Sequence, residues 1–188
     1  MTTNNSRGRE NVTGAIPRNG GQQEGPRLTS EQVWQAIAKA SFAVLSYVTP
    51  AGEPRSSGVV YKAIGRRLRA GVEPDSWKAK HVAATGRVAV TDPVRSGGLL
   101  SLLTPIPPAT ISFHGAAIVH PAGSPQARAL LTELGSLIPK ERQASDAVIE
   151  ILPEGKFLTY GVGVSLRAML HPAAAQARVP VTQGEDTR

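Results

Sequence analysis

The sequence predicts a mainly β domain of the α+β class, with six or seven short antiparallel strands closed into a small barrel and two or three flanking helices. The spacing of the candidate strands supports this prediction. Four of them follow one another between Phe42 and Thr91, and their connections are too short for parallel β-α-β units. Closure is expected because it removes the exposed edges that many short strands otherwise leave.

The first element expected after a polar leader, residues 1–27, is a helix. Thr29 stands three residues before Gln32, a spacing that predicts a capping box. Apolar residues such as Val33 and Ile37 then recur at helical spacing, so we expect one face of this helix to pack on the barrel.

Runs of β-branched and aromatic residues, separated by turn residues, define the next elements. Pro50-Ala51-Gly52 is a turn signal between a first strand and a second. The elements expected up to residue 91 are strands at 42–49, 55–62 and 66–72, a short helix that begins at Ser76, and a strand at 87–91.

A proline-containing segment at residues 92–108 is expected to be an inserted loop or a short helix. The elements expected after it are a strand at 110–120, a helix begun by Ser124-Pro125, and strands at 147–152 and 156–164. Pro153-Glu154-Gly155 predicts a hairpin turn between the last two strands. Residues 28–171 are therefore expected to form one domain, and the Ala-rich residues 172–188 a C-terminal tail.

The composition excludes several kinds of site. The chain has no cysteine, which rules out disulfides and thiolate metal sites and fits a cytoplasmic location. Its four histidines are scattered without metal-ligand spacing, and no catalytic triad can be argued, so we expect neither a metal site nor a protein nucleophile. No apolar run approaches the ~20 residues of a membrane-spanning helix, so no membrane partner is expected.

The net charge of +7 raises the question of nucleic acid binding. Several arginines lie near the two ends of the chain, and aromatic residues make up only 4% of the sequence. Single-strand binding needs aromatic faces for base stacking, and no recognition helix or zinc finger motif is present. The sequence therefore argues against a nucleic acid partner, and a basic pocket for a phosphorylated small molecule explains the charge as well.

Ser76-Trp77-Lys78 is the candidate functional motif. A hydroxyl group, a cation and the free N–H groups of a helix start meet there, which is what a bound phosphate needs. Each residue also has a plainer interpretation. Ser76 can be only a helix cap, Lys78 part of a solvated helix face, and Trp77 an anchor in a core or an interface.

The segment from Phe42 to Thr91 resembles the flavin-binding split-barrel family typified by pyridoxamine 5′-phosphate oxidase. The matching residues are Gly52-x-Pro54 before a strand that ends at Lys62, the strand 68–72, Ser76-x-Lys78-Ala79, and Val88-Ala89-Val90. The resemblance implies a split barrel that forms a homodimer and binds flavin mononucleotide (FMN), or alternatively the deazaflavin F420, in the cleft between subunits.

The resemblance also implies a set of cofactor-binding residues. These are Ser57, Gly58 and Val59 along the isoalloxazine ring, Lys62, Ser76 and Lys78 at the phosphate, and Trp77 between the last two. A bound flavin carries the hydride itself, so no catalytic residue is expected from the protein. The expected function is an oxidoreductase acting on a small-molecule substrate.

A second function is kept open by two departures from the family pattern. The family has arginines where Ser57 and Trp77 stand in this sequence, and both losses remove phosphate-binding charge. The alternative is a non-catalytic flavin- or small-ligand-binding protein that has kept the barrel.

Overall fold

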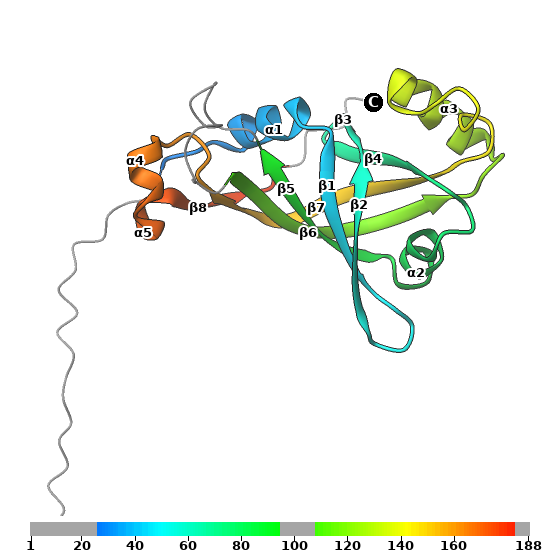
Figure 1. Ribbon diagram of the computed structural model, residues 1–188, viewed down its shortest axis with the longest axis horizontal. Coiled ribbons are helices and arrows are strands. Elements are labelled where there is room, and N and C mark those ends of the chain that lie inside the picture. Colours follow the sequence, from blue (N-terminus) through cyan, green and yellow to red (C-terminus); the bar gives the residue numbers. More distant parts are fainter. Residues whose placement is uncertain (1–25, 95–107, 183–188) are drawn as a thin grey trace, which may run out of the picture.

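Eight antiparallel strands form one sheet that curls into a half-barrel in the computed structural model, which describes residues 26–94 and 108–182 (Figure 1). The strands are β1 (Phe42–Val48), β2 (Pro54–Val60), β3 (Lys62–Ile64), β4 (Arg67–Val72), β5 (Arg87–Val94), β6 (Ala109–His120), β7 (Ala147–Tyr160) and β8 (Gln176–Pro180). The helices are α1 (Ser30–Lys39), α2 (Trp77–Thr85), α3 (Pro125–Leu134), the 3-10 turn η2 (Gly135–Leu137), α4 (Leu166–Met169) and α5 (Pro172–Ala175). The α+β split-barrel class expected from the sequence is confirmed.

The strand order is β2-β1-β5-β6-β7-β4-β3, and β8 also pairs with β7. β6 pairs along one edge of β7. On the other edge, β4 pairs with the first half of β7 and β8 pairs with the second half. Tyr61 alone separates β2 from β3, the two strands at opposite ends of this order. The strand expected at 55–62 is thus two strands, and the chain passes at Tyr61 from one end of the strand order to the other.

The hairpin turn expected at residues 153–155 is wrong, because β7 runs through these residues as one strand. The pairing of β6 with β7 shifts register between Ser112 and His114, and Gly155 has a positive φ of 70°. A bulge therefore bends the strand here without reversing it.

The C-terminal residues also differ from the expectation. Residues 172–180, assigned to a tail, form α5 and β8, and β8 is hydrogen-bonded to β7. Ala175 and Val179 are buried. Val179 is the only β-branched residue of this five-residue strand, so the sequence shows little of the alternating pattern that marks a strand. Most of the expected leader, residues 1–25, most of the 92–108 segment and residues 183–188 lie outside the described residues.

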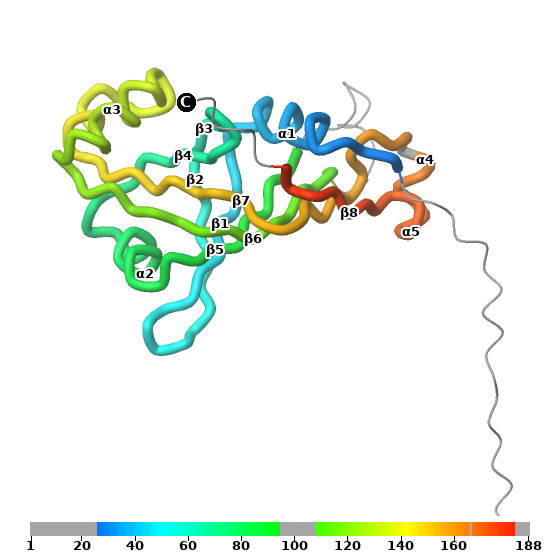
Figure 2. Tube along the Cα trace, turned by 180° about the vertical axis from the view of Figure 1, so that it is seen from behind, coloured from blue at the N-terminus to red at the C-terminus, as the bar shows by residue number. Residues whose placement is uncertain are grey.

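Helix α1 packs on the sheet as its apolar face predicts (Figures 1 and 2). The expected capping box is present, since Gln32 N–H donates to Thr29 Oγ1 at 3.2 Å and Thr29 N–H donates to Gln32 Oε1 at 2.9 Å. Inside the barrel, Trp34 meets Phe157 edge-on at 5.4 Å between ring centroids, and Phe157 meets Phe113 in the same way at 5.5 Å. These contacts fix α1 on the core.

A carboxylic acid is buried beside Tyr61 inside the barrel. Asp92 of β5 is 0% exposed, and its Oδ2 contacts the hydroxyl of Tyr61. The same hydroxyl lies 2.9 Å from the carbonyl oxygen of Ile37 in α1. Asp92 Oδ1 has no hydrogen-bond partner in the described part of the chain. Burial raises the pKa of Asp92 from 3.8 to about 6, against a smaller lowering by the bond with Tyr61.

Candidate functional site

The start of α2 is shaped by Ser76, which follows β4 after a short turn. Ser76 Oγ accepts a hydrogen bond from Ala79 N–H at 3.4 Å and donates its own proton to the carbonyl oxygen of Glu73 at 2.6 Å. Ser76 is therefore a helix cap, as one interpretation of the sequence had it. Its hydroxyl proton is used within the turn, so the side chain reaches a phosphate only after rotating away from Glu73.

Two backbone donors and one cation remain at this helix start. The N–H groups of Trp77 and Lys78 are the first two of α2 and have no acceptor within the helix. The ammonium group of Lys78 makes no hydrogen bond or ion pair with the residues that the structure describes. The positive end of the helix dipole adds to this charge, so the α2 start favours an anion.

The acidic side chains near the α2 start are held in ion pairs. Asp75 Oδ1 lies 3.4 Å from Lys80 Nζ, and Glu73 Oε1 lies 3.9 Å from an Nη atom of Arg142. Both pairs are exposed and contribute little to stability. They do reduce the repulsion that these carboxylates would exert on an anion beside Lys78.

The expected ring-binding residues of β2 point in different directions. Val59 is 6% exposed and Ser57 Oγ is buried without a partner among the described atoms, so both side chains face the barrel interior. Gly58 faces outward, where a Cβ atom would lie 2.8 Å from Cε2 of Phe42. The aromatic ring that Gly58 admits in this structure is thus the ring of Phe42 from the neighbouring strand β1.

Lys62 lies away from the other expected phosphate ligands. Its Nζ donates to the carbonyl oxygen of Glu133 in α3 at 2.8 Å. Helix α3 and helix α2 are at separate places on the sheet in both views (Figures 1 and 2). The structure therefore groups Ser76, Trp77 and Lys78 at α2 and leaves Lys62 beside α3.

A network of charges surrounds Lys62 and holds α3 on the sheet. Arg69 pairs with Glu133 and, from Nε, with Glu150 Oε1 at 3.1 Å. His120 Nε2 lies 3.2 Å from Glu150 Oε2. Burial works to raise the pKa of Glu150, but the bonds from His120 and Arg69 and the arginine charges hold it below its usual value. This network is structural, since each of its charges already has a partner.

A cleft of about 650 Å³ lies between the β1–β2 hairpin and α2. Its lining is Tyr47, Thr49, Pro50, Ala51, Glu53, Arg55, Ser56, Trp77 and His81. Trp77 is the only expected site residue in it. The others were missed because no local signal places the β1–β2 hairpin against α2.

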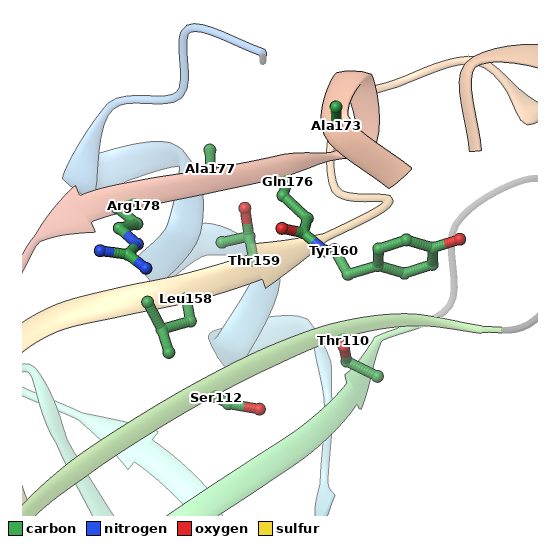
Figure 3. A pocket seen from close by; sticks show the side chains of 9 residues that line it. All are labelled: Thr110, Ser112, Leu158, Thr159, Tyr160, Ala173, Gln176, Ala177 and Arg178. Atoms are coloured by element: carbon green, nitrogen blue, oxygen red, sulfur yellow. The ribbon is translucent and has the colours of Figure 1, made fainter. Parts of the chain in front are cut away.

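A second pocket, of about 500 Å³, opens on the outer side of β6, β7 and β8. Figure 3 shows the guanidinium group of Arg178 near Leu158, while the ring of Tyr160 extends in the opposite direction. Thr110 and Ser112 contribute hydroxyl groups from β6. None of the residues expected from the sequence to bind a cofactor lines this pocket.

Within residues 26–94 and 108–182, no helix is long and apolar enough to cross a membrane. The same residues contain no group of three or more His, Asp or Glu side chains that could hold a metal ion.

Several solved structures are similar to this chain in fold. A FAD-binding protein from Mesorhizobium loti has 18% sequence identity and a TM-score of 0.50, over 68% of this chain and 91% of that one. The heme storage protein of Vibrio cholerae has 11% identity and a TM-score of 0.58, over 72% of this chain and 98% of that one. A heme-binding protein from Mycobacterium smegmatis has 15% identity and a TM-score of 0.57, over 83% of this chain and 59% of that one. No protein-family model and no curated protein matches the sequence.

At such low identities the similarity establishes the fold alone. Proteins named for a flavin and proteins named for heme share this fold. The choice of ligand for this chain therefore depends on its own side chains and on the start of α2.

Proposed function

We propose that this protein is a flavin-dependent oxidoreductase of the family typified by pyridoxamine 5′-phosphate oxidase, with FMN as cofactor and the deazaflavin F420 as the alternative. The observation that carries the proposal is the start of α2. There, two N–H groups and the ammonium of Lys78, which have no partner among the described residues, offer an anion site at the end of a barrel strand. The fold shared with a FAD-binding protein supports the same class of cofactor.

The residues at α2 fit the phosphate of a flavin. The N–H groups of Trp77 and Lys78 are donors of the kind that bind phosphate at a helix start, and Lys78 supplies the charge. Ser76 holds the turn in shape through its bond to Glu73. A bound flavin supplies hydride transfer, so these residues need only bind and orient it. A ring laid against Gly58 requires Phe42 to turn aside, because Phe42 occupies that space.

The proposal includes a homodimer with the cofactor between subunits. The outer face of β1 and β2 exposes three large apolar side chains, Phe42 at 47%, Val48 at 46% and Val60 at 46%. Phe42 and Val60 are paired across β1 and β2, while Val48 lies at the other end of β1. The exposed apolar pair favours burial against a second copy. The substrate would be a small molecule reached from this interface, and the location the cytoplasm.

Substitution of Lys78 tests the phosphate site. Wild-type protein and Lys78→Ala are titrated with FMN, with riboflavin and with F420, and affinities are measured from flavin fluorescence and equilibrium dialysis. A charge-assisted contact contributes about 1.5–3 kcal/mol, so Lys78→Ala should weaken FMN binding about 10- to 100-fold. Riboflavin has no phosphate, and its affinity should be the same for both proteins.

The matched control is Lys80→Ala on the same helix, where the lysine pairs with Asp75. It should change FMN affinity much less than Lys78→Ala. Equal affinity of Lys78→Ala and wild type for FMN would remove Lys78 from the site. If the wild-type protein binds neither FMN nor F420, the proposal is rejected.

A non-catalytic flavin- or ligand-binding protein is the second candidate, and specific residues favour it. Neither Ser57 nor Trp77 provides the arginine charge that the family pattern has at these positions, and Ser57 faces the barrel interior. One assay distinguishes the two functions. Flavin-loaded protein is mixed with a reduced nicotinamide cofactor under anaerobic conditions. Bleaching of the flavin band at a catalytically useful rate supports the oxidoreductase. Tight binding without bleaching supports the second candidate.

A further inference from the structure

The cleft between the β1–β2 hairpin and α2 contains three aromatic rings in a row. The ring of His81 lies 5.8 Å from that of Tyr47 and 5.5 Å from that of Trp77, measured between centroids. The two interplanar angles are 52° and 39°, so the rings are tilted rather than perpendicular. Tyr47 belongs to β1 and the other two to α2, so the row of rings exists only because the fold places α2 beside β1.

Trp77 is the outermost ring of this row. Its side chain is 74% exposed, whereas the other tryptophan, Trp34, is 6% exposed in the core. One tilted contact with His81 covers only part of the indole surface. Aromatic side chains gain stability by stacking on other rings, so an indole left open at the cleft mouth has unused stacking area.

The charged groups of the cleft cancel each other. Arg55 donates to Glu53 Oε2 at 2.7 Å, and Thr49 Oγ1 accepts from Glu53 N–H at 3.1 Å. Among the residues that the structure describes, no other Asp, Glu, Lys or Arg lines the cleft. A ligand here thus meets aromatic surface, hydroxyl groups and a neutralised ion pair, which suits an uncharged molecule.

We propose that this cleft binds an uncharged, planar ring system of two or three fused aromatic rings, stacked on Trp77. The volume of about 650 Å³ lies within the range of small-molecule sites. Ser76 and Lys78 do not line the cleft. The two proposed sites share Trp77, whose backbone N–H belongs to the phosphate site and whose indole ring belongs to the cleft, and stacking on the ring does not require a bound phosphate.

The two tryptophans allow a direct test by fluorine NMR. Protein labelled with 5-fluorotryptophan should give two resonances, one for Trp34 and one for Trp77. Trp77→Phe assigns them by removing one. Titration with 2-naphthol, the probe, should shift the Trp77 resonance to saturation and leave that of Trp34 unchanged. 2-Naphthoate has the same rings and a negative charge, and should bind several-fold more weakly.

Variants measured by equilibrium dialysis complete the test. Trp77→Ala should weaken 2-naphthol binding at least 10-fold, and Trp77→Phe, which retains a ring, only a few-fold. The matched control is Leu170→Ala, another exposed apolar position at 69% exposure outside the cleft, which should bind as wild type does. An unchanged Trp34 resonance in Trp77→Ala shows that the variant is folded.

Three results would overturn the proposal. The first is a Trp77 resonance that does not respond to 2-naphthol but changes with protein concentration, which assigns Trp77 to a contact between two copies. The second is tighter binding of 2-naphthoate than of 2-naphthol. The third is displacement of 2-naphthol by FMN in direct competition, which makes the cleft part of the cofactor site. Saturable 2-naphthol binding in protein that binds no flavin would support the cleft and reject only the proposed cofactor.

Discussion

The wild-type protein should lose stability as pH rises, because Asp92 is buried in the barrel core and ionises there. Replacement of Asp92 by asparagine should remove this loss. The hydroxyl of Tyr61 has one proton, yet its oxygen contacts both Asp92 Oδ2 and the carbonyl oxygen of Ile37. Both contacts are hydrogen bonds only if Asp92 contributes a second proton as a neutral acid. Ionised Asp92 would take the Tyr61 proton away from Ile37 and place a buried charge beside an unpartnered oxygen.

The size of the effect follows from the pKa of Asp92, which burial raises from 3.8 to about 6. A raised folded-state pKa means that the contribution to stability is complete below the unfolded pKa and is lost as pH rises through the folded one. The complete loss is about 3 kcal/mol, and about 2 kcal/mol of it falls between about pH 4 and pH 6. Asparagine stays neutral at every pH, so the Asp92→Asn variant should not show this loss of stability.

Urea unfolding of both proteins, followed by circular dichroism from about pH 4 to pH 8, measures the difference. Other titrating groups are common to the two proteins and cancel when one curve is subtracted from the other. The stability of Asp92→Asn relative to wild type should rise by about 2.5 kcal/mol across this interval and level off above about pH 7. Parallel curves would refute the neutral buried acid.

Two further substitutions test contacts on the sheet surface and under α3. Gly58→Ala should destabilise the protein by about 1 kcal/mol in thermal unfolding, because its Cβ forces the ring of Phe42 to turn, and the loss should vanish in a Phe42→Ala background. Glu150→Gln should cost about 1–3 kcal/mol near neutral pH, since Arg69 and His120 lose a buried ionised partner. The pKa of Glu150 is lowered, so this cost should shrink as pH falls, and an equal cost at about pH 4 and pH 7 in urea unfolding would count against the charge pairing.

Local signals in the sequence predicted most elements of the fold. The Thr29–Gln32 capping box, the Ser76 cap and the strand pattern of β1 each depend on residues close together in the chain. Such signals cannot tell a turn from a bulge, because both use glycine at positive φ, and Gly155 was assigned to the wrong one. They also miss β8. Hydrogen bonds to β7 hold this strand in the sheet, although its sequence lacks an alternating hydrophobic pattern.

The candidate site was harder to predict because it depends on which segments meet. Ser76, Trp77 and Lys78 are neighbours in the sequence and lie at one helix start, where the sequence predicts a helix to begin. The sequence had no means of showing that Phe42 fills the space above Gly58, or that Lys62 is held by α3. Both contacts join residues far apart in the sequence, and only the strand register and the helix packing create them.

The position of β7 has a consequence for how this protein is made. While a ribosome has yet to synthesise Ala147 and the residues after it, both β4 and β6 lack the neighbour that covers one edge of each. Exposed edges of this kind associate with other chains, so the unfinished polypeptide passes through an aggregation-prone stage. Synthesis of β7 ends that stage, because this single late segment supplies the missing partner to both strands.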